Sequence, residues 1–237
     1  MKAAVWLSIV CVLAAEMALA AQTPQTAASS ADLEQVLSQM DAAAAGFKTA
    51  QADFVWDQYT KVVNETDSQS GKVYFRRTSK ETEMAADIAQ PTAKYVLYQN
   101  STVRLYEPRI DQVTVYNTGK NRAEVESFLV LGFGGRGHDL EKSFDVSFAG
   151  YEQVNDVRAA KLNLVPRTEK GKSIFDHIVL WIDPAQGVSV QQQFVEPQGD
   201  YRLAKYSNIR LNQSLPGDVF KLKTTERTKT VTPQGSF

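Results

Sequence analysis

The stretch GKVYFRR, residues 71–77, alternates apolar and polar side chains and ends in two arginines. Such alternation predicts a β-strand with one face toward a core. Successive side chains of a strand point to opposite faces of the sheet, so Val73, Phe75 and Arg77 share one face. An arginine on an otherwise apolar face needs a partner or a function. This face is therefore the first candidate for a functional surface.

The same alternation recurs over most of the chain. Short polar breaks separate the runs, which favours tight connections and an antiparallel sheet. Further strands are predicted at residues 53–60, 82–88, 94–98, 102–107, 112–116, 144–148, 160–165, 174–183, 188–196 and 201–211, with a last piece around 219–222.

Two segments have helical periodicity instead. The first opens the domain, and Gly46 is placed to end it; its apolar stripe is Leu33, Val36, Leu37, Met40, Ala44 and Phe47. The second spans residues 121–131, with Val125, Phe128 and Leu129 on one stripe, and is followed by the glycine-rich stretch 132–137. A helix that ends in such flexible residues is a candidate lid.

These elements predict the fold class. About 10 to 11 strands and two or three helices make more sheet than the helices can cover from outside. We therefore expect an α+β fold, mainly β, in which an incomplete, unclosed antiparallel β-barrel is closed by the helices. No linker or repeat divides residues 32–237, which we expect to form a single domain.

The first 20 residues have the features of a secretory signal peptide. A basic start at Lys2 precedes an apolar run, and small residues follow at Ala18 and Ala20. The apolar run falls short of the roughly 20 residues that span a bilayer. Residues 21–31 are small and polar, which predicts a flexible lead. The single cysteine, Cys11, lies in the signal peptide, so we expect no disulfide or thiolate site in the mature chain.

The composition also bears on the ligand. The chain has 26 Lys and Arg against 27 Asp and Glu, whereas nucleic-acid binding needs a clustered excess of cations. Residues 132–137 spell G-x-G-x-x-G, but the next strand follows too soon for a dinucleotide-binding crossover helix. His138 and His177 begin no metal-ligand pattern and are expected at the surface.

We therefore expect no catalytic residue, metal site, cofactor or nucleic-acid partner. A carboxylate pair of the glycosidase kind needs no proximity in sequence and stays open.

Large apolar residues at alternating positions are core residues in most β proteins, but in a curled sheet the inward face is both core and pocket. The lid and gating candidates are Arg77, Val125, Phe128 and Leu129. The candidates for an apolar lining that binds a ligand are Phe47, Phe54, Trp56, Val73, Phe75, Met84, Leu97, Leu105, Val113, Phe133, Leu180 and Ile182.

Several segments together resemble the LolA-type outer-membrane lipoprotein carriers and the wider lipoprotein-sorting family. The resemblance extends over residues 32–222 and rests on order and spacing rather than on one motif. The segments are LEQVL at 33–37, FKTAQADFVWDQ at 47–58, GKVYFRR at 71–77, TVRLYEPRIDQVTV at 102–115, LWIDP at 180–184 and YSNIRLNQSLPGDVFKL at 206–222.

The resemblance implies a periplasmic carrier that is not an enzyme. Its apolar half-barrel cavity would bind the acyl chains of lipoproteins and shuttle them from the inner to the outer membrane. An inner-membrane lipoprotein-release transporter and an outer-membrane acceptor would be the partners, and we expect a monomer. Arg77 matches the family's arginine that hydrogen-bonds to the lid and controls its opening, although Thr78 follows it where the family often has proline.

Two alternatives stay open at this stage. The same half-barrel could serve as an envelope sensor or scaffold domain that binds lipid or mislocalised lipoproteins. A secreted hydrolase with a carboxylate pair in the cleft is the alternative from another class.

Overall fold

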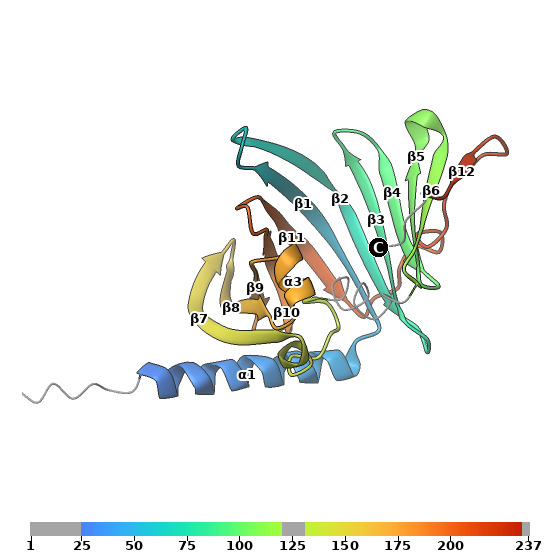
Figure 1. The fold of residues 1–237 in the computed structure, drawn as a ribbon. Coiled ribbons are helices and arrows are strands. Elements are labelled where there is room, and N and C mark those ends of the chain that lie inside the picture. Colours follow the sequence, from blue (N-terminus) through green and yellow to red (C-terminus); the bar gives the residue numbers. More distant parts are fainter. Residues whose placement is uncertain (1–24, 120–130, 234–237) are drawn as a thin grey trace, which may run out of the picture.

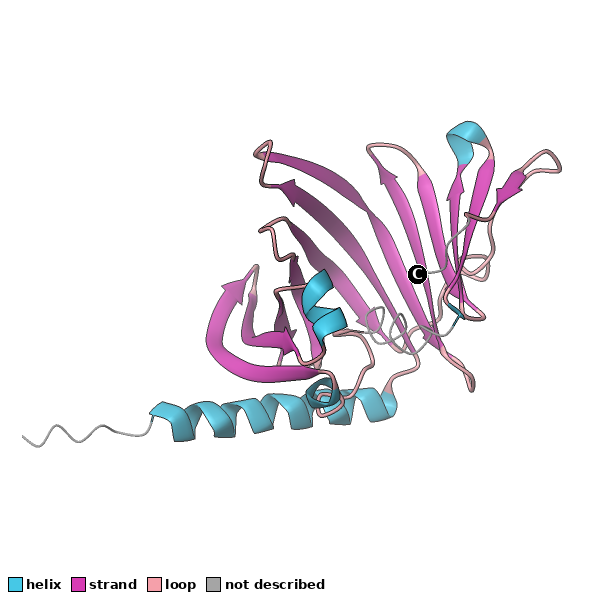
Figure 2. Cartoon of the chain, in the orientation of Figure 1, coloured by secondary structure: helices cyan, strands magenta, loops and turns pink. Residues whose placement is uncertain are grey.

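The computed structural model describes residues 25–119 and 131–233, which form one curved 12-stranded sheet with a long helix along one end (Figures 1 and 2). The fold class is the expected one. The elements are α1 (Gln25–Gly46), β1 (Thr49–Thr60), β2 (Glu65–Arg77), β3 (Thr82–Gln90), β4 (Lys94–Gln99), β5 (Thr102–Glu107), η1 (Pro108–Ile110), β6 (Gln112–Asn117), η3 (Leu140–Lys142), β7 (Phe144–Val154), β8 (Val157–Pro166), α3 (Glu169–Ile174), β9 (His177–Asp183), β10 (Val188–Val195), β11 (Tyr201–Leu211) and β12 (Lys229–Val231).

The sheet is an unclosed half-barrel. Its strand order is β12-β6-β5-β4-β3-β2-β1-β11-β10-β9-β8-β7, so β12 and β7 each have a neighbour on one side only. All pairs are antiparallel except β12 with β6, which is parallel. The pairing of β1 with β11 joins the first strand of the domain to a strand near its end. The curved sheet therefore has one concave face and one outer face along its whole length.

Helix α1 begins earlier than the sequence pattern predicts. It starts at Gln25, inside the segment 21–31 for which we predicted a flexible lead. Ala27, Ala28 and Ala31 favour helix, and no glycine or proline interrupts the sequence before Gly46. Within the described residues, no helix is long and apolar enough to cross a membrane.

Two apolar clusters occupy the concave face. The first, called the α1 cluster, buries the apolar stripe of the helix against strands β7 to β10; its members include Val36, Leu37, Met40, Leu131, Phe144, Leu162, Leu164, Ile178, Leu180 and Ile182. The second, called the β1–β3 cluster, contains Phe47, Ala50, Phe54, Val73, Phe75, Ile88, Phe133 and Val188. The helix thus fills one half of the curve and leaves the other half to the strands.

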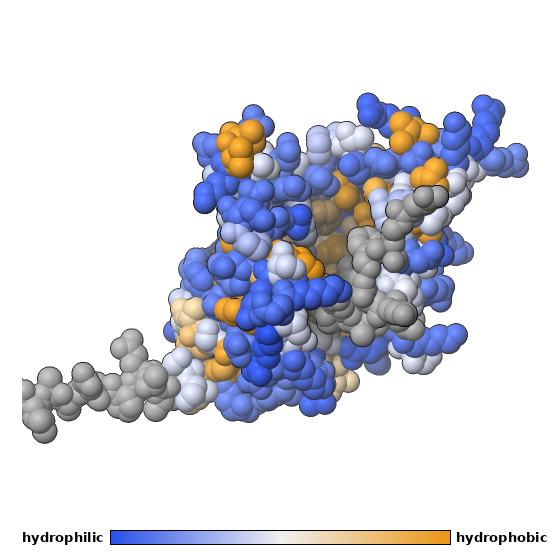
Figure 3. Space-filling view, viewed as in Figure 1, coloured by the Kyte–Doolittle hydropathy of each residue, from blue (hydrophilic) through white to orange (hydrophobic). Residues whose placement is uncertain are grey.

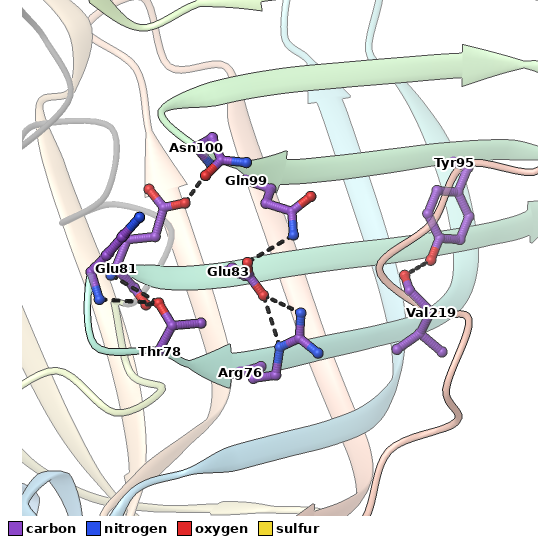
Figure 4. Close-up of polar contacts among 9 residues, drawn as sticks. Arg76, Thr78, Glu81, Glu83, Tyr95, Gln99, Asn100 and Val219 are labelled. Atoms are coloured by element: carbon purple, nitrogen blue, oxygen red, sulfur yellow. Dashed lines mark hydrogen bonds and ion pairs between the residues drawn. The ribbon is translucent and has the colours of Figure 1, made fainter.

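The C-terminal segment covers the outer face instead of adding the strand expected at 219–222. Val219 and Phe220 pack on Tyr74, Ala85 and Leu97, and the Tyr95 hydroxyl donates a hydrogen bond to the Val219 carbonyl (Figure 4). The segment crosses a face of the sheet and not an edge. Strand pairing needs the free backbone groups of an edge, and a face offers none.

A short helix, α3, replaces the start of the strand expected at 174–183. The Thr168 hydroxyl accepts a hydrogen bond of 3.0 Å from the Gly171 amide, which is a normal N-cap. The strand itself begins at His177. Figure 1 shows α3 inside the curve of the sheet, where the flanking Phe175 joins the α1 cluster.

Candidate functional site

The concave face contains an apolar pocket of about 380 Å³ that the side chains of residues 25–119 and 131–233 leave unfilled. In Figure 3, apolar side chains are visible inside the hollow of the sheet. The pocket is lined by Phe54, Trp56, Val73, Phe75, Met84, Ala86, Phe175, Phe194, Arg202 and Tyr206. Five of the lining residues proposed from the sequence are among them: Phe54, Trp56, Val73, Phe75 and Met84.

Strand register explains why these residues meet. Phe75 pairs with Met84 across β2 and β3, and Phe54 pairs with Tyr206 across β1 and β11. Directly paired residues of adjacent strands project to the same face. Phe175, just after α3, and Phe194 of β10 complete the wall, with their ring centroids 5.6 Å apart.

The inner end of the pocket is closed by stacked aromatic rings. Phe133 lies parallel to Phe75 with ring centroids 4.8 Å apart, and it meets Tyr206 edge-on at 4.9 Å. Phe47 belongs to the same cluster. Phe47 and Phe133, two of the proposed lining residues, thus lie in the cluster behind the pocket wall.

The polar atoms at this inner end already bond to one another. The Tyr206 hydroxyl donates to the Gln192 side-chain oxygen at 3.2 Å, and the Gln192 amide donates to the Leu131 carbonyl. Burial raises the pKa of Tyr206, so the hydroxyl stays protonated and able to donate. This network ties the segment after residue 130 to strands β10 and β11.

Arg202 is the one charged residue among those that line the pocket. It lies on β11, paired with Phe194 of β10 and Gln58 of β1. Its guanidinium forms an ion pair of 2.8 Å with Glu196, and the two side chains are 36% and 27% exposed. The pocket is therefore apolar inside, with an arginine–glutamate ion pair at its partly exposed end.

Arg77 points to the concave face, as the alternation predicts. Its guanidinium donates a hydrogen bond of 2.7 Å to the Ala44 carbonyl at the end of α1 and also donates to the Gly134 carbonyl. It lies over the Phe47 ring, 5.3 Å from the centroid. Arg77 thus joins β2, the end of α1 and the glycine-rich stretch. Val125, Phe128 and Leu129 lie outside the described residues.

The glycine-rich stretch is packed rather than open. The Ser189 amide donates to the Gly132 carbonyl at 2.8 Å. Gly132 and Gly134 have φ near +78° and +77°, and a side chain on Gly137 would collide with the Leu37 backbone. These glycines are required by close approach of α1, Phe47 and β10, and no dinucleotide-type turn into a helix follows them.

The remaining proposed lining residues lie away from the pocket. Leu180 and Ile182 are fully buried in the α1 cluster, where helix side chains fill the space. Leu97 packs in the outer-face cluster, and the register of β4 to β6 puts Val113 on that same outer face. Leu105 is half-buried and shares the concave face with Val96, its partner on β4. Alternation alone did not reveal which face was concave or where α1 would pack.

His138 is a feature that the sequence pattern missed. Its ring nitrogens lie 2.8 Å from Asp41 and 3.2 Å from Glu34, both on α1. Hydrogen bonds to Asp41 and then to Glu34 raise the pKa of His138. The i and i+7 spacing of the two acids, on one helix face, was the available signal. The ring of His177, in contrast, contacts the adjacent Asp176 at 2.7 Å, a purely local pair.

Two acids of neighbouring positions, Glu81 and Glu83, are buried. Glu83 accepts hydrogen bonds from Arg76 and from Gln99, and Glu81 accepts from the Asn100 amide at the β4–β5 turn (Figure 4). These contacts give both acids structural partners at strand ends. Within residues 25–119 and 131–233, no cluster of His, Cys, Asp and Glu could hold a metal ion.

A second cleft, of about 770 Å³, lies beyond Arg77. It is larger than the apolar pocket, but charged side chains contribute much of its lining, among them Asp41, Lys80, Arg136 and Asp139. Such a lining does not suit a hydrocarbon chain, because the charges would lose water without gaining a partner. We therefore place the candidate ligand site in the smaller pocket.

The structure combines an open, mainly antiparallel half-barrel, a helix along one end and an apolar pocket, which defines a class of protein that binds apolar ligands on a concave sheet face. The family model for "Outer membrane lipoprotein carrier protein LolA" matches residues 45–223, and the chain belongs to this family. A search of curated proteins found no match to the sequence.

Solved structures share the fold at low sequence identity. An uncharacterized conserved protein from Thermus thermophilus aligns with a TM-score of 0.54 and 11% identity, over 85% of this chain and 99% of that chain. MucB aligns with a TM-score of 0.53 and 13% sequence identity, over 81% of this chain and 63% of the MucB chain. A chain of the Pseudomonas aeruginosa MucA/MucB complex aligns with a TM-score of 0.50 and 13% sequence identity, over 81% of this chain and 61% of that chain. This chain therefore spans less than two thirds of the MucB chains.

Proposed function

We propose that this protein is a periplasmic carrier that binds the acyl chains of lipoproteins and shuttles them from the inner to the outer membrane. The observation that carries the proposal is the apolar pocket of about 380 Å³ on the concave face. Family membership supports the cargo class. A half-barrel whose core needed only its own side chains would leave no such space.

The size of the pocket sets the energy scale of binding. A methylene group takes up about the volume of a water molecule in the liquid, roughly 30 Å³, so 380 Å³ corresponds to roughly a dozen methylene groups. Each buried methylene contributes about 0.8 kcal/mol, which gives about 10 kcal/mol in total. A carrier that must also release its cargo needs a conformational change that offsets part of this energy.

Arg77 is placed to act as a gate in the conformational change that releases cargo. It bonds the end of α1 and the middle of the glycine-rich stretch to strand β2, and Phe133 in that stretch closes the inner end of the pocket. We propose that cargo displaces this contact. The proposed gating residues are Arg77, Val125, Phe128 and Leu129. The proposed partners are an inner-membrane lipoprotein-release transporter and an outer-membrane acceptor. We propose that the carrier acts as a monomer after removal of its signal peptide.

The test uses two valines on adjacent strands. Val73 lines the pocket and is 7% exposed, whereas Val55 is 40% exposed. Native mass spectrometry of the protein from the periplasm should show bound acylated peptide or lipid. Val73→Glu should abolish it and Val55→Glu should leave it unchanged. Because Val73→Glu could unfold the chain, Met84→Gln at the half-exposed wall provides a milder second variant.

An assay of lipoprotein transfer to an acceptor membrane then tests whether the protein is a carrier or only binds its ligand. The wild-type chain loaded with an acylated lipoprotein should deliver it, and Arg77→Leu should bind cargo but deliver it poorly. If wild-type protein carries no hydrocarbon from the periplasm and takes up none in vitro, the carrier proposal is wrong.

A sensor role is the second candidate, because the MucB chain of the MucA/MucB complex shares the fold. A sensor would bind the same ligand but release it to no membrane. It would instead change its affinity for a protein partner when loaded. Cargo binding without any transfer, in the same assay, would favour this candidate.

A further inference from the structure

We propose that the apolar pocket takes a single acyl chain that ends in an anionic group, and that Arg202 is the residue that anchors this group. The inference rests on the proposed lipid-binding function and goes beyond the lipoprotein cargo, because it names a ligand with a free anionic end. Carboxylate and phosphate ends share the anionic oxygens that the proposal requires.

The first argument is the position of the charge. Nine of the ten residues that line the pocket are uncharged, and Arg202 is the tenth. The side chain is 36% exposed, so the guanidinium lies where the hydrocarbon wall meets water. An amphiphile with its tail inside would bring its head group to the same boundary.

The second argument is the direction of the pocket. Arg202, Ala204 and Tyr206 alternate along β11 and share the concave face. Four residues of a strand extend about 13 Å. The Tyr206 end is closed by Phe133, and its polar atoms already bond through Gln192. A chain therefore fits with its tail at Tyr206 and its head at Arg202.

The third argument is the number of chains. A volume of 380 Å³, at roughly 30 Å³ for each methylene, corresponds to roughly a dozen methylene groups. That is one medium-length chain, and two such chains would need about twice the volume.

The fourth argument is that Arg202 already binds an anion of the protein itself. Glu196 forms the 2.8 Å pair, and both partners are partly exposed. Such surface pairs are weak, so a ligand anion that is also held by its buried chain can replace the carboxylate. A guanidinium can bind two oxygens of a carboxylate or phosphate at once.

Calorimetric titration of the full mature chain tests the anchor with three probes of equal chain length. These are myristate, myristyl alcohol and myristoyl lysophosphatidic acid, each below its aggregation threshold. Wild-type protein should bind the two anions about tenfold or more tightly than the alcohol. Arg202→Gln should remove this preference and leave alcohol binding unchanged. Glu196→Gln, which frees the guanidinium, should increase the preference for the two anions over the alcohol.

Arg210→Gln is the matched control, since Arg210 lies on the same strand but lines a separate cleft with Asp53 and Lys72. The carboxylate and phosphate probes identify which anion source is preferred. Equal binding of acid and alcohol by wild type, or a preference that survives Arg202→Gln, overturns the anchor alone. Failure of all three probes to bind overturns the proposed lipid-binding function together with the anchor.

Discussion

Replacing Arg77 by leucine removes a contact that joins three parts of the fold. The guanidinium donates to the Ala44 carbonyl at 2.7 Å and to the Gly134 carbonyl, and it lies 5.3 Å from the centroid of Phe47. Leucine keeps apolar volume on the concave face but has no donor. The variant therefore isolates the hydrogen bonds from the packing of the side chain.

The expected magnitude follows from these contacts. Hydrogen bonds from a charged donor contribute about 1.5–3 kcal/mol each, and the cation–π contact adds about 0.5–1 kcal/mol. Removing the guanidinium opens the otherwise buried carbonyl of Ala44 to water in the large polar cleft, because both residues line that cleft. We therefore expect the free energy of unfolding to fall by about 2–4 kcal/mol. For a chain of this size the melting temperature should fall by about 2–4 °C per kcal/mol.

Urea denaturation gives the free energy, and hydrogen exchange locates the change. Amides of residues 131–137 and of the last turn of α1 should exchange faster in Arg77→Leu than in wild type, and amides of β8 and β9 should not. Arg210→Leu, at an exposed position of β11, controls for loss of a charge. If Arg77→Leu and Arg210→Leu are equally stable, Arg77 does not hold these segments together.

Three further predictions concern the pH response, the glycine-rich stretch and the two apolar clusters. The folded-state pKa of His138 is raised by its bonds to α1 carboxylates, so its stabilisation is complete below its unfolded value of about 6.5 and is lost as pH rises through the raised pKa. Melting temperatures from about pH 5.5 to about pH 8.5 should show this loss in wild type but not in His138→Gln. Gly137→Ala would force a methyl group into the backbone of α1, whereas Gly46 has open space around it. Gly137→Ala should destabilise by at least about 2 kcal/mol in urea titrations, and an unaffected variant would contradict the packed stretch; Gly46→Ala is the control. Leu180→Ala should cost about 2–5 kcal/mol with little change in ligand binding, and Met84→Ala should weaken acyl binding with a smaller loss of stability, because Leu180 is fully buried and Met84 faces the pocket.

Local patterns were sufficient to predict most elements of the sheet. The alternation in residues 71–77 puts Val73, Phe75 and Arg77 on one face, and the structure confirms that face as concave. Strand alternation is a local consequence of backbone geometry, so it can be recognised without knowing the partners. The order of segments over residues 32–222 was also sufficient for the family.

Local patterns failed where a segment's conformation depended on its packing. The residues 219–222 have a strand-like composition, but they pack on a sheet face that has no free edge. The glycine content of 132–137 predicts a hinge, which stays a prediction, but it could not reveal that α1 and β10 approach these glycines closely in the structure. His138 gains its partners only because α1 lies beside the stretch that precedes β7.

The sequence by itself determined that the chain forms a curled, mainly antiparallel sheet with an apolar inner face and an inward arginine at position 77. Only the tertiary structure decided which part of that face is pocket and which is core, because α1 covers Leu180 and Ile182 but not Phe54 or Met84. The physical reason is that the position of a residue along a strand determines the face to which its side chain points. The space in front of that face depends instead on segments that are distant in sequence.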